Sequence, residues 1–330
     1  MSGPGRLFWP DVLRSASAFA IVLLHVAASR IKTLQPGEPG WWSAVLLRSV
    51  PAFAVPVFFM LSGMFFLDPG RDVSRRKILG SCKRLLLAFA FWSVVYQFAF
   101  PPHSLRLVPS LKGPVHLWFL PAIATCYLLS PALRAVSSSR SAERTFLAVA
   151  FLTGCLLPTL RLVSPVLARS LPPSANVSVV SFPVFYFVLG NRLARGPAGR
   201  TGGIVLAVAA TLSFFAMLFI CGGLSKTGAR PIGLTADQAT VALFAAGVFA
   251  GCRRLLSCAS PSPAAARAVG IVSRCSFGVY LVHNAVVWTI PEFSSRIAVD
   301  VPARTLAVFA VSLAATLVLG RIPVLRKVVS

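Results

Sequence analysis

Acidic residues are scarce in this 330-residue chain, which contains 8 Asp and Glu against 32 Lys and Arg. Charged residues of both signs make up 12% of the sequence, about half the share found in soluble globular proteins. Hydrophobic residues make up 56%. This composition excludes an ordinary soluble domain, and it predicts that most of the chain lies within a lipid bilayer.

Other familiar features are also missing. The sequence has no glycine-rich phosphate loop and no repeat with a period of about 20–50 residues. Its seven cysteines lack paired ligand spacing, so we expect buried free thiols, with no metal site and no disulfide. The net charge of +24 suggests nucleic acid, but the basic residues are scattered through the loops without a recognition module. We therefore expect no nucleic-acid partner.

Long apolar runs, separated by clusters of Arg, Pro and Gly, make up most of the sequence. One membrane crossing needs about 20 such residues. The runs predict about ten transmembrane helices, near residues 12–29, 44–67, 84–100, 116–133, 145–163, 177–191, 202–222, 236–252, 269–290 and 303–320. Because these crossings leave only short loops, we expect one all-α domain over residues 1–330, with no folded extramembrane part.

The basic residues predict the orientation of the helices. With the N-terminus inside, 20 Lys and Arg fall in inner segments and 11 in outer segments, and Arg14 lies inside the first helix. Because basic residues that flank helices are retained in the cytoplasm, both termini are expected on the cytoplasmic side of the inner membrane. The run at 12–29 also resembles a cleaved signal peptide, but Arg14 and His25 interrupt it.

Arg14 and His25 are eleven residues apart in the first apolar run. On an α-helix this spacing returns to within about 20° of the same face, with a rise of about 16 Å. Asp11 lies three residues before Arg14, close enough to pair with it. Snorkelling would explain Arg14 alone, and an interhelical hydrogen bond would explain His25 alone. Together on one face, they favour a polar cavity inside the bundle.

The spacing of Arg14 and His25 also resembles a family motif. The hallmark of the membrane-bound acyltransferase 3 family is an Arg, ten residues and then a His in the first helix. Family-like segments follow in the expected order: VPVFFMLSG at 55–63, HLWFL at 116–120, FYFVLG at 185–190, SFGVYLVH at 276–283 and RIPVLRK at 321–327. The resemblance spans nearly the whole chain, and it is closest to the short forms that O-acetylate surface polysaccharides.

The resemblance implies a membrane-bound O-acyltransferase. Such an enzyme transfers an acyl group, usually acetyl from acetyl-CoA, to a hydroxyl of a cell-envelope glycan or lipid-linked saccharide, and needs no bound cofactor. Arg14 and His25 would be the essential pair, in a central cavity that CoA enters from inside and glycan from outside. His25 would act either as general base on the acceptor or as a relay that carries the acyl group, while Arg14 binds or polarises the donor.

The densest basic stretch, residues 71–84, lies between the second and third predicted helices. It is interpreted either as charge that orients the chain near lipid head groups or as a dock for the phosphates of the donor. The candidate donor-binding residues are Arg75, Arg76, Lys77, Lys83 and Arg84. Relatives often carry Arg-x-x-Arg here, whereas SCKR at 81–84 keeps only the second Arg, and Ala88 replaces a common Pro.

Four further residues are candidates for the cavity or for acceptor binding. His116 and Trp118 open the fourth predicted helix, where an interfacial aromatic belt is the alternative explanation. Tyr280 and His283 share a face of the ninth predicted helix, where an interhelical hydrogen bond is the alternative. Ser62 and Gly63 are more typical of close helix packing than of a catalytic serine.

Two other functions fit the same residues. Intramembrane ionisable groups also mark transport routes, so the chain could move a glycan or an acyl group without catalysis. No inverted pairing of broken helices supports that alternative. A non-catalytic subunit of an envelope assembly is the third hypothesis.

Overall fold

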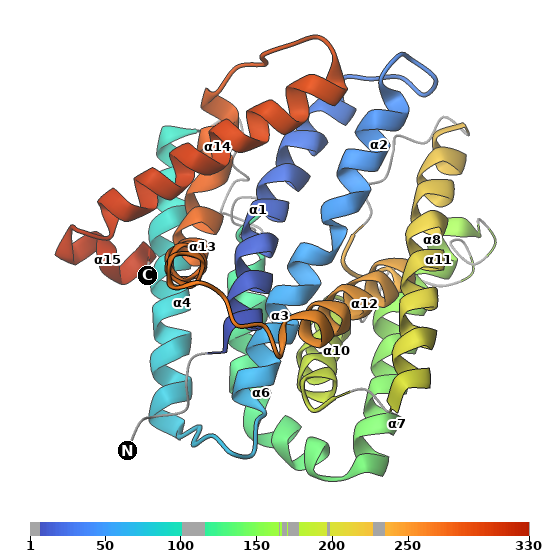
Figure 1. Ribbon diagram of the computed structural model, residues 1–330, viewed down its shortest axis with the longest axis vertical. Coiled ribbons are helices and arrows are strands. Elements are labelled where there is room, and N and C mark those ends of the chain that lie inside the picture. The colour runs from blue at the N-terminus through green and yellow to red at the C-terminus, as the bar shows by residue number, and fades with distance from the viewer. Residues whose placement is uncertain are drawn as a thin grey trace.

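A computed structural model describes residues 7–100, 116–164, 166, 170, 178–196, 199–226 and 235–329. Every regular element within these residues is helical, and the helices pack side by side in a bundle (Figure 1). The predicted all-α architecture is therefore confirmed. In chain order the helices are α1 (Phe8–Ile31), α2 (Trp41–Ser49), α3 (Ala54–Phe66), α4 (Arg75–Ala99), α6 (Phe119–Ser138), α7 (Arg140–Phe151), α8 (Leu157–Val163), α10 (Ser178–Ala194), α11 (Gly199–Lys226), α12 (Ala239–Leu256), α13 (Pro263–Thr289), α14 (Ile297–Leu319) and α15 (Pro323–Val329).

Nine helical segments in the described residues are long and apolar enough to cross a membrane. They lie at nine of the ten predicted positions. The tenth position is occupied by α10, whose 17 residues are at the lower end of the roughly 17–25 that a crossing needs. Two of the nine are composite: a 3-10 turn, Val50–Phe53, joins α2 to α3, and a π-helical turn, Leu152–Leu156, joins α7 to α8.

The third crossing begins earlier than predicted. Ser74 caps α4 by accepting a hydrogen bond from the backbone nitrogen of Lys77, at 3.4 Å. This cap lets the helix start at Arg75, nine residues before the predicted boundary at 84. The prediction that residues 71–84 form a loop is thus wrong for most of the segment. Its basic side chains project from the first turns of a helix, so their relative directions are set by the helix geometry.

Two glycines let α3 and α10 approach closely. A β-carbon added to Gly63 would lie 2.9 Å from the Cα of Phe187 and closer still to its carbonyl oxygen. A β-carbon at Gly190 would overlap the backbone of Met60 in the same way. The contact is therefore backbone on backbone, as small residues permit between membrane helices. This confirms that Gly63 is a packing residue, and the contact fixes the α3 backbone next to Ser62.

Helix α1 crosses the middle of the bundle and contacts α2, α3, α13 and α14 (Figure 1). Near one end, Asp11 accepts a hydrogen bond of 2.6 Å from Ser273 of α13. At the other end, buried Arg30 forms an ion pair with Asp300, at 3.3 Å, and a second ion pair with Glu292. Polar contacts at both ends thus attach α1 to the last third of the chain.

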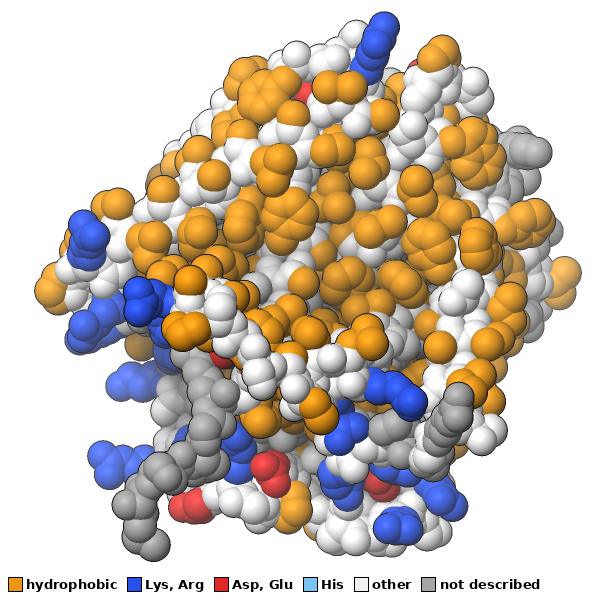
Figure 2. Space-filling model, viewed as in Figure 1, with side chains coloured by type: hydrophobic (Ala, Val, Ile, Leu, Met, Phe, Trp, Pro, Cys, Tyr) orange, Lys and Arg blue, Asp and Glu red, His pale blue; other side chains and the backbone are white. Residues whose placement is uncertain are grey.

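The surface is largely apolar. Phe98, Phe219 and Leu255 are 81%, 80% and 80% exposed. Figure 2 shows hydrophobic side chains over the middle of one face, and Lys and Arg gathered mainly toward the end where the N-terminus lies. Exposed aromatic and aliphatic side chains on this scale match lipid better than water, which supports a multi-pass membrane protein.

Candidate active site

The structure places Arg14 and His25 on one continuous helix, α1, as their spacing predicts. The rise between them is about 16 Å, or three turns. They therefore lie at different depths along the bundle, and each belongs to a different group of side chains. Arg14 borders a cavity, whereas His25 lies among other imidazoles.

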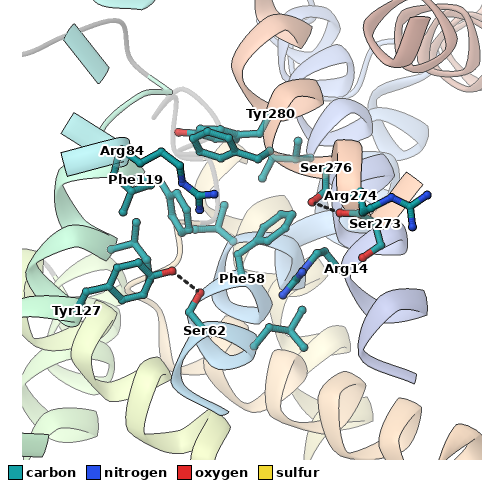
Figure 3. A pocket seen from close by; sticks show the side chains of 16 residues that line it. Arg14, Phe58, Ser62, Arg84, Phe119, Tyr127, Ser273, Arg274, Ser276 and Tyr280 are labelled. Carbon is teal, nitrogen blue, oxygen red and sulfur yellow. Dashed lines mark hydrogen bonds between the residues drawn. The ribbon is translucent and has the colours of Figure 1, made fainter. Parts of the chain in front are cut away.

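The cavity has a volume of about 250 Å³. Figure 3 shows Arg14 and Arg84 reaching toward its centre from opposite sides. Its lining comes from α1, α3, α4, α6 and α13, and consists of Arg14, Ile21, Val55, Phe58, Leu61, Ser62, Arg84, Leu85, Phe119, Ile123, Tyr127, Ser273, Arg274, Ser276, Phe277 and Tyr280. The predicted central polar cavity is thus present, and charged, polar and apolar side chains all line it.

Positive charge dominates the polar lining of this cavity. Three arginines line it, and none of its described lining residues is Asp or Glu. Aromatic rings support two of them: the guanidinium carbon of Arg14 lies 5.8 Å from the ring centre of Phe65, and that of Arg84 lies 5.7 Å from Phe277. Cation–π contacts hold a guanidinium without consuming its hydrogen-bond donors. The arrangement suits a ligand with several negative charges.

Two uncharged polar side chains of the cavity wall bond to each other. Tyr127 of α6 donates a hydrogen bond to the hydroxyl of Ser62 on α3, at 3.4 Å (Figure 3). The ring of Tyr127 stacks on Phe66, with centroids 3.9 Å apart and planes within 6° of parallel. Ser62 is therefore held by Tyr127, and among the described residues no imidazole bonds to it.

Two residues of the cavity wall adjoin the histidines. Tyr280 lines the cavity, and its hydroxyl donates a hydrogen bond to the backbone carbonyl of His116. Ile21 also lines the cavity, one helical turn before His25. The cavity wall and the histidines are thus in direct contact through α1 and α13.

Three imidazoles meet beyond this wall, and we call them the histidine trio: His25, His116 and His283. Their ring centroids are 5.0 Å apart for His25 and His283, 5.5 Å for His116 and His283, and 6.4 Å for His25 and His116. His116 and His283 are 4% and 0% exposed. The described residues contain no group of His, Cys, Asp or Glu arranged to hold a metal ion.

The other predicted site residues are dispersed. Arg84 borders the cavity, while Lys77 lies with its ammonium 5.9 Å from the ring of Phe66. Arg75, Arg76 and Lys83 are exposed on α4 and do not line the cavity.

Trp118 is separate from both groups. It is 40% exposed and packs on Phe182, with ring centroids 5.7 Å apart. Its neighbour two residues earlier, His116, is buried in the trio instead of lying in an exposed aromatic belt.

Arg274 and Tyr127 are lining residues that could contact a ligand and that were not among the sequence candidates. Arg274 lies inside the apolar run predicted at 269–290, so the rule that singled out Arg14 would also have found it. Tyr127 gave no such signal, because a tyrosine in an apolar helix is ordinary.

Comparison with protein families decides the class of the chain. The model of the acyltransferase domain of acyltransferase family 3 matches residues 7–321. The chain belongs to acyltransferase family 3. Comparisons with curated proteins and with solved structures gave no match.

The family match covers every element of the site in this acyltransferase, from α1 to the end of α14. Acyl transfer needs a group that moves a proton or carries the acyl unit, and a place where the acyl donor binds. The histidine trio offers imidazoles for the first need, and the arginine-lined cavity offers a pocket for the second.

Proposed function

We propose that this acyltransferase moves an acetyl group from cytoplasmic acetyl-CoA to a hydroxyl of a cell-envelope glycan or a lipid-linked saccharide. The observation that carries the proposal is the contact between the two groups: Tyr280, which lines the cavity that three arginines border, donates a hydrogen bond to the backbone carbonyl of His116, whose ring belongs to the trio with His25. A polyanionic donor fits a cavity bordered by arginines, and its acylated end would lie on the side of Tyr280.

The dimensions of the cavity suggest which part of the donor it takes. A volume of about 250 Å³ is below the roughly 300–1,000 Å³ of pockets that enclose drug-sized ligands. We therefore assign the acylated arm of the donor, together with the phosphate that ends this arm, to this cavity. A second cavity of about 570 Å³ lies between the start of α1 and the segment that joins α12 to α13, and it shares Arg274 with the first. This larger space is where we place the nucleotide end.

Basic residues outside the cavities would bring the donor to its site. Arg75, Arg76, Lys77 and Lys83 lie on exposed turns of α4, the helix that carries Arg84 into the cavity. Exposed cations attract phosphates from a distance and raise the rate of encounter. In this proposal Arg84 binds donor phosphate inside the cavity, and the other four hold or guide it at the membrane surface.

The separation of Arg14 from His25 favours different roles for the two residues. A guanidinium about 16 Å along the helix from His25 is too far to share one reacting atom with it. We therefore assign Arg14 to donor binding through its planar fork. His25 lies at the end of the path that the thioester would follow.

The reaction balances with His25 as the proton carrier. The acceptor oxygen attacks the thioester carbonyl carbon while the imidazole removes the hydroxyl proton. The C–S bond then breaks, and the departing thiolate takes the proton from the imidazolium, which yields CoA thiol and an ester. In the relay version the imidazole nitrogen first attacks the thioester and releases CoA, and the acceptor oxygen then takes the acyl group from nitrogen.

We also propose that the protein lies in the cytoplasmic (inner) membrane with both termini facing the cytoplasm. The basic side chains at the N-terminal end of the bundle support this orientation (Figure 2). Donor would then enter at the Arg14 end, and acceptor would approach His25 from the opposite face.

The test measures CoA release by the purified protein from acetyl-CoA, with and without lipid-linked glycan. Release that depends on acceptor identifies an enzyme, whereas binding without release would favour a transporter. His25→Ala should lower turnover by about 10²- to 10⁴-fold at matched membrane levels. Arg14→Lys should be nearly as damaging as Arg14→Ala, because Lys keeps the charge and loses the fork.

Two controls match these changes. Ser17→Ala removes another buried polar side chain from α1, and Arg296→Lys makes the same exchange at an exposed position. Both should retain full activity. Normal glycan acetylation by His25→Ala would remove the catalytic assignment, and full activity of Arg14→Lys would reduce Arg14 to a membrane anchor.

A further inference from the structure

We propose that His283 is a positioning residue that fixes the tautomer and the direction of the His25 ring, an inference that rests on the proposed role of His25 in acyl transfer. The geometry of the trio carries it. The His25 and His283 rings are the closest of the three pairs, with centroids 5.0 Å apart, and they come from different helices, α1 and α13.

The backbone of α13 sets the tautomer of His283. Its Nδ1 lies 2.7 Å from the carbonyl oxygen of Tyr280 and 3.2 Å from that of Val279. A carbonyl oxygen can only accept a hydrogen bond, so Nδ1 must carry a proton. In the neutral ring, Nε2 then holds a lone pair and can only accept.

That lone pair has no partner in the described residues. The Nε2 atom of His283 is fully buried and makes no recorded hydrogen bond, within a side chain that is 0% exposed. An unsatisfied buried acceptor costs about 1–3 kcal/mol, so such an atom calls for a donor. Nδ1 faces the carbonyl groups of α13, and Nε2, one ring carbon away, directs its lone pair away from them.

His25 is the donor that the geometry offers. Two imidazoles with centroids 5.0 Å apart come within hydrogen-bonding distance after a small side-chain rotation, or through one bridging water. An N–H of His25 directed at Nε2 of His283 leaves the other nitrogen of His25 with a free lone pair. That nitrogen is the one needed for either version of the reaction, as a base or as the atom that carries the acyl group.

His116 is less suited to this role. Its ring centroid is 6.4 Å from that of His25, farther than the 5.0 Å between His25 and His283. The backbone carbonyl of Leu281, on α13, faces its ring. What holds His116 is its backbone carbonyl, which accepts from the hydroxyl of Tyr280.

The experiment compares three replacements of His283 that differ in where they place an acceptor. Gln carries its amide oxygen near the position of Nε2, Asn carries one near the position of Nδ1, and Phe keeps ring volume without any acceptor. All three are tested for acetyl-CoA turnover with lipid-linked glycan, at matched membrane levels and with the apparent melting temperature recorded.

We expect His283→Gln to retain a substantial fraction of the wild-type kcat. His283→Asn and His283→Phe should lose roughly 10²-fold or more, as enzymes do when the group that orients a catalytic imidazole is removed. The KM for acetyl-CoA should stay unchanged in all three, since the donor cavity is intact. Ser312→Ala is the matched control. Like the His283 variants, it changes a fully buried side chain whose polar atom has no hydrogen-bond partner among the described residues, and it should not change kcat.

Equal activity of the three His283 variants would overturn the proposal, as would a change in KM alone. The same Gln, Asn and Phe series at His116 is measured in parallel, and selective rescue by Gln there but not at His283 would also overturn it. If His25→Ala remains active, the proposed function itself fails. If His25→Ala is inactive and the His283 variants do not differ, only the positioning role fails.

Discussion

Replacing Gly63 with Ala tests the packing that holds the cavity wall. The added methyl group would lie 2.9 Å from the Cα of Phe187 on α10, whereas carbon atoms normally approach to about 3.5–4.0 Å. The carbonyl oxygen of Phe187 lies closer still, and backbone atoms cannot rotate away, so α3 and α10 must separate by more than about an ångström. Such overpacking typically costs about 1–3 kcal/mol.

A second effect of this substitution acts in the opposite direction. Exchanging Gly for Ala in a helix interior stabilises the helix by about 1 kcal/mol. Because the obstacle is rigid, we expect the free-energy cost of the clash to be about 3 kcal/mol, the upper end of the overpacking range. After the gain in helix propensity is subtracted, Gly63→Ala should be less stable than wild type by about 2 kcal/mol. Gly80→Ala and Gly251→Ala provide the control, because a β-carbon at either position meets no atom within 4 Å. These two variants should be as stable as wild type or slightly more stable.

The buried thiols of the chain provide the assay. Cys82, Cys126, Cys155 and Cys221 are free and buried, so a thiol-reactive dye reports their exposure as detergent-solubilised protein is heated. At one fixed scan rate, Gly63→Ala should show a midpoint several degrees below wild type, and both controls should not. A midpoint for Gly63→Ala equal to that of Gly80→Ala would refute the backbone contact between α3 and α10.

Two further predictions concern the donor and the orientation. Replacing Arg75, Arg76 and Lys77 together with Gln should weaken CoA binding more than tenfold, since well-formed phosphate contacts contribute about 1.5–3 kcal/mol each. Titration of the purified protein with CoA measures this, and the pair Arg140→Gln with Arg144→Gln, exposed on α7, should leave affinity unchanged. Tags at both termini should resist protease added outside intact cells, and cleavage of either tag would contradict the proposed topology.

Periodicity and hydropathy predicted the helices well because the bilayer imposes one length and one polarity on each crossing. They misplaced the start of α4, because the first turns of this helix are rich in basic residues and so lack the hydropathy of a membrane span. The start is set by the cap at Ser74, which periodicity and hydropathy do not detect. The Arg14 and His25 spacing predicted their common helix face. It could not predict the depth at which each meets other helices.

The histidine trio illustrates the limit of sequence reasoning. His116 and His283 were singled out separately, each with an ordinary explanation, because no spacing along the chain relates position 25 to positions 116 and 283. The three rings come within 5.0–6.4 Å of one another because α1 packs against α13 and the turn before α6 lies beside both. Tertiary contacts of this kind carry no signal in a single sequence.

The polar contacts of α1 also have a consequence for biosynthesis. Asp11 meets its partner Ser273 only 262 residues later in the chain, and Arg30 meets Asp300 later still. At about 5–20 residues per second, the ribosome needs on the order of tens of seconds to make that stretch. During this time the first helix to leave the ribosome carries a carboxylate and a guanidinium without these partners. Both groups lie in end turns of α1, Asp11 in the first and Arg30 in the last, where water at the membrane surfaces can solvate them. The contacts that attach α1 to α13 and α14 therefore form late in synthesis, after the helices between them have been made.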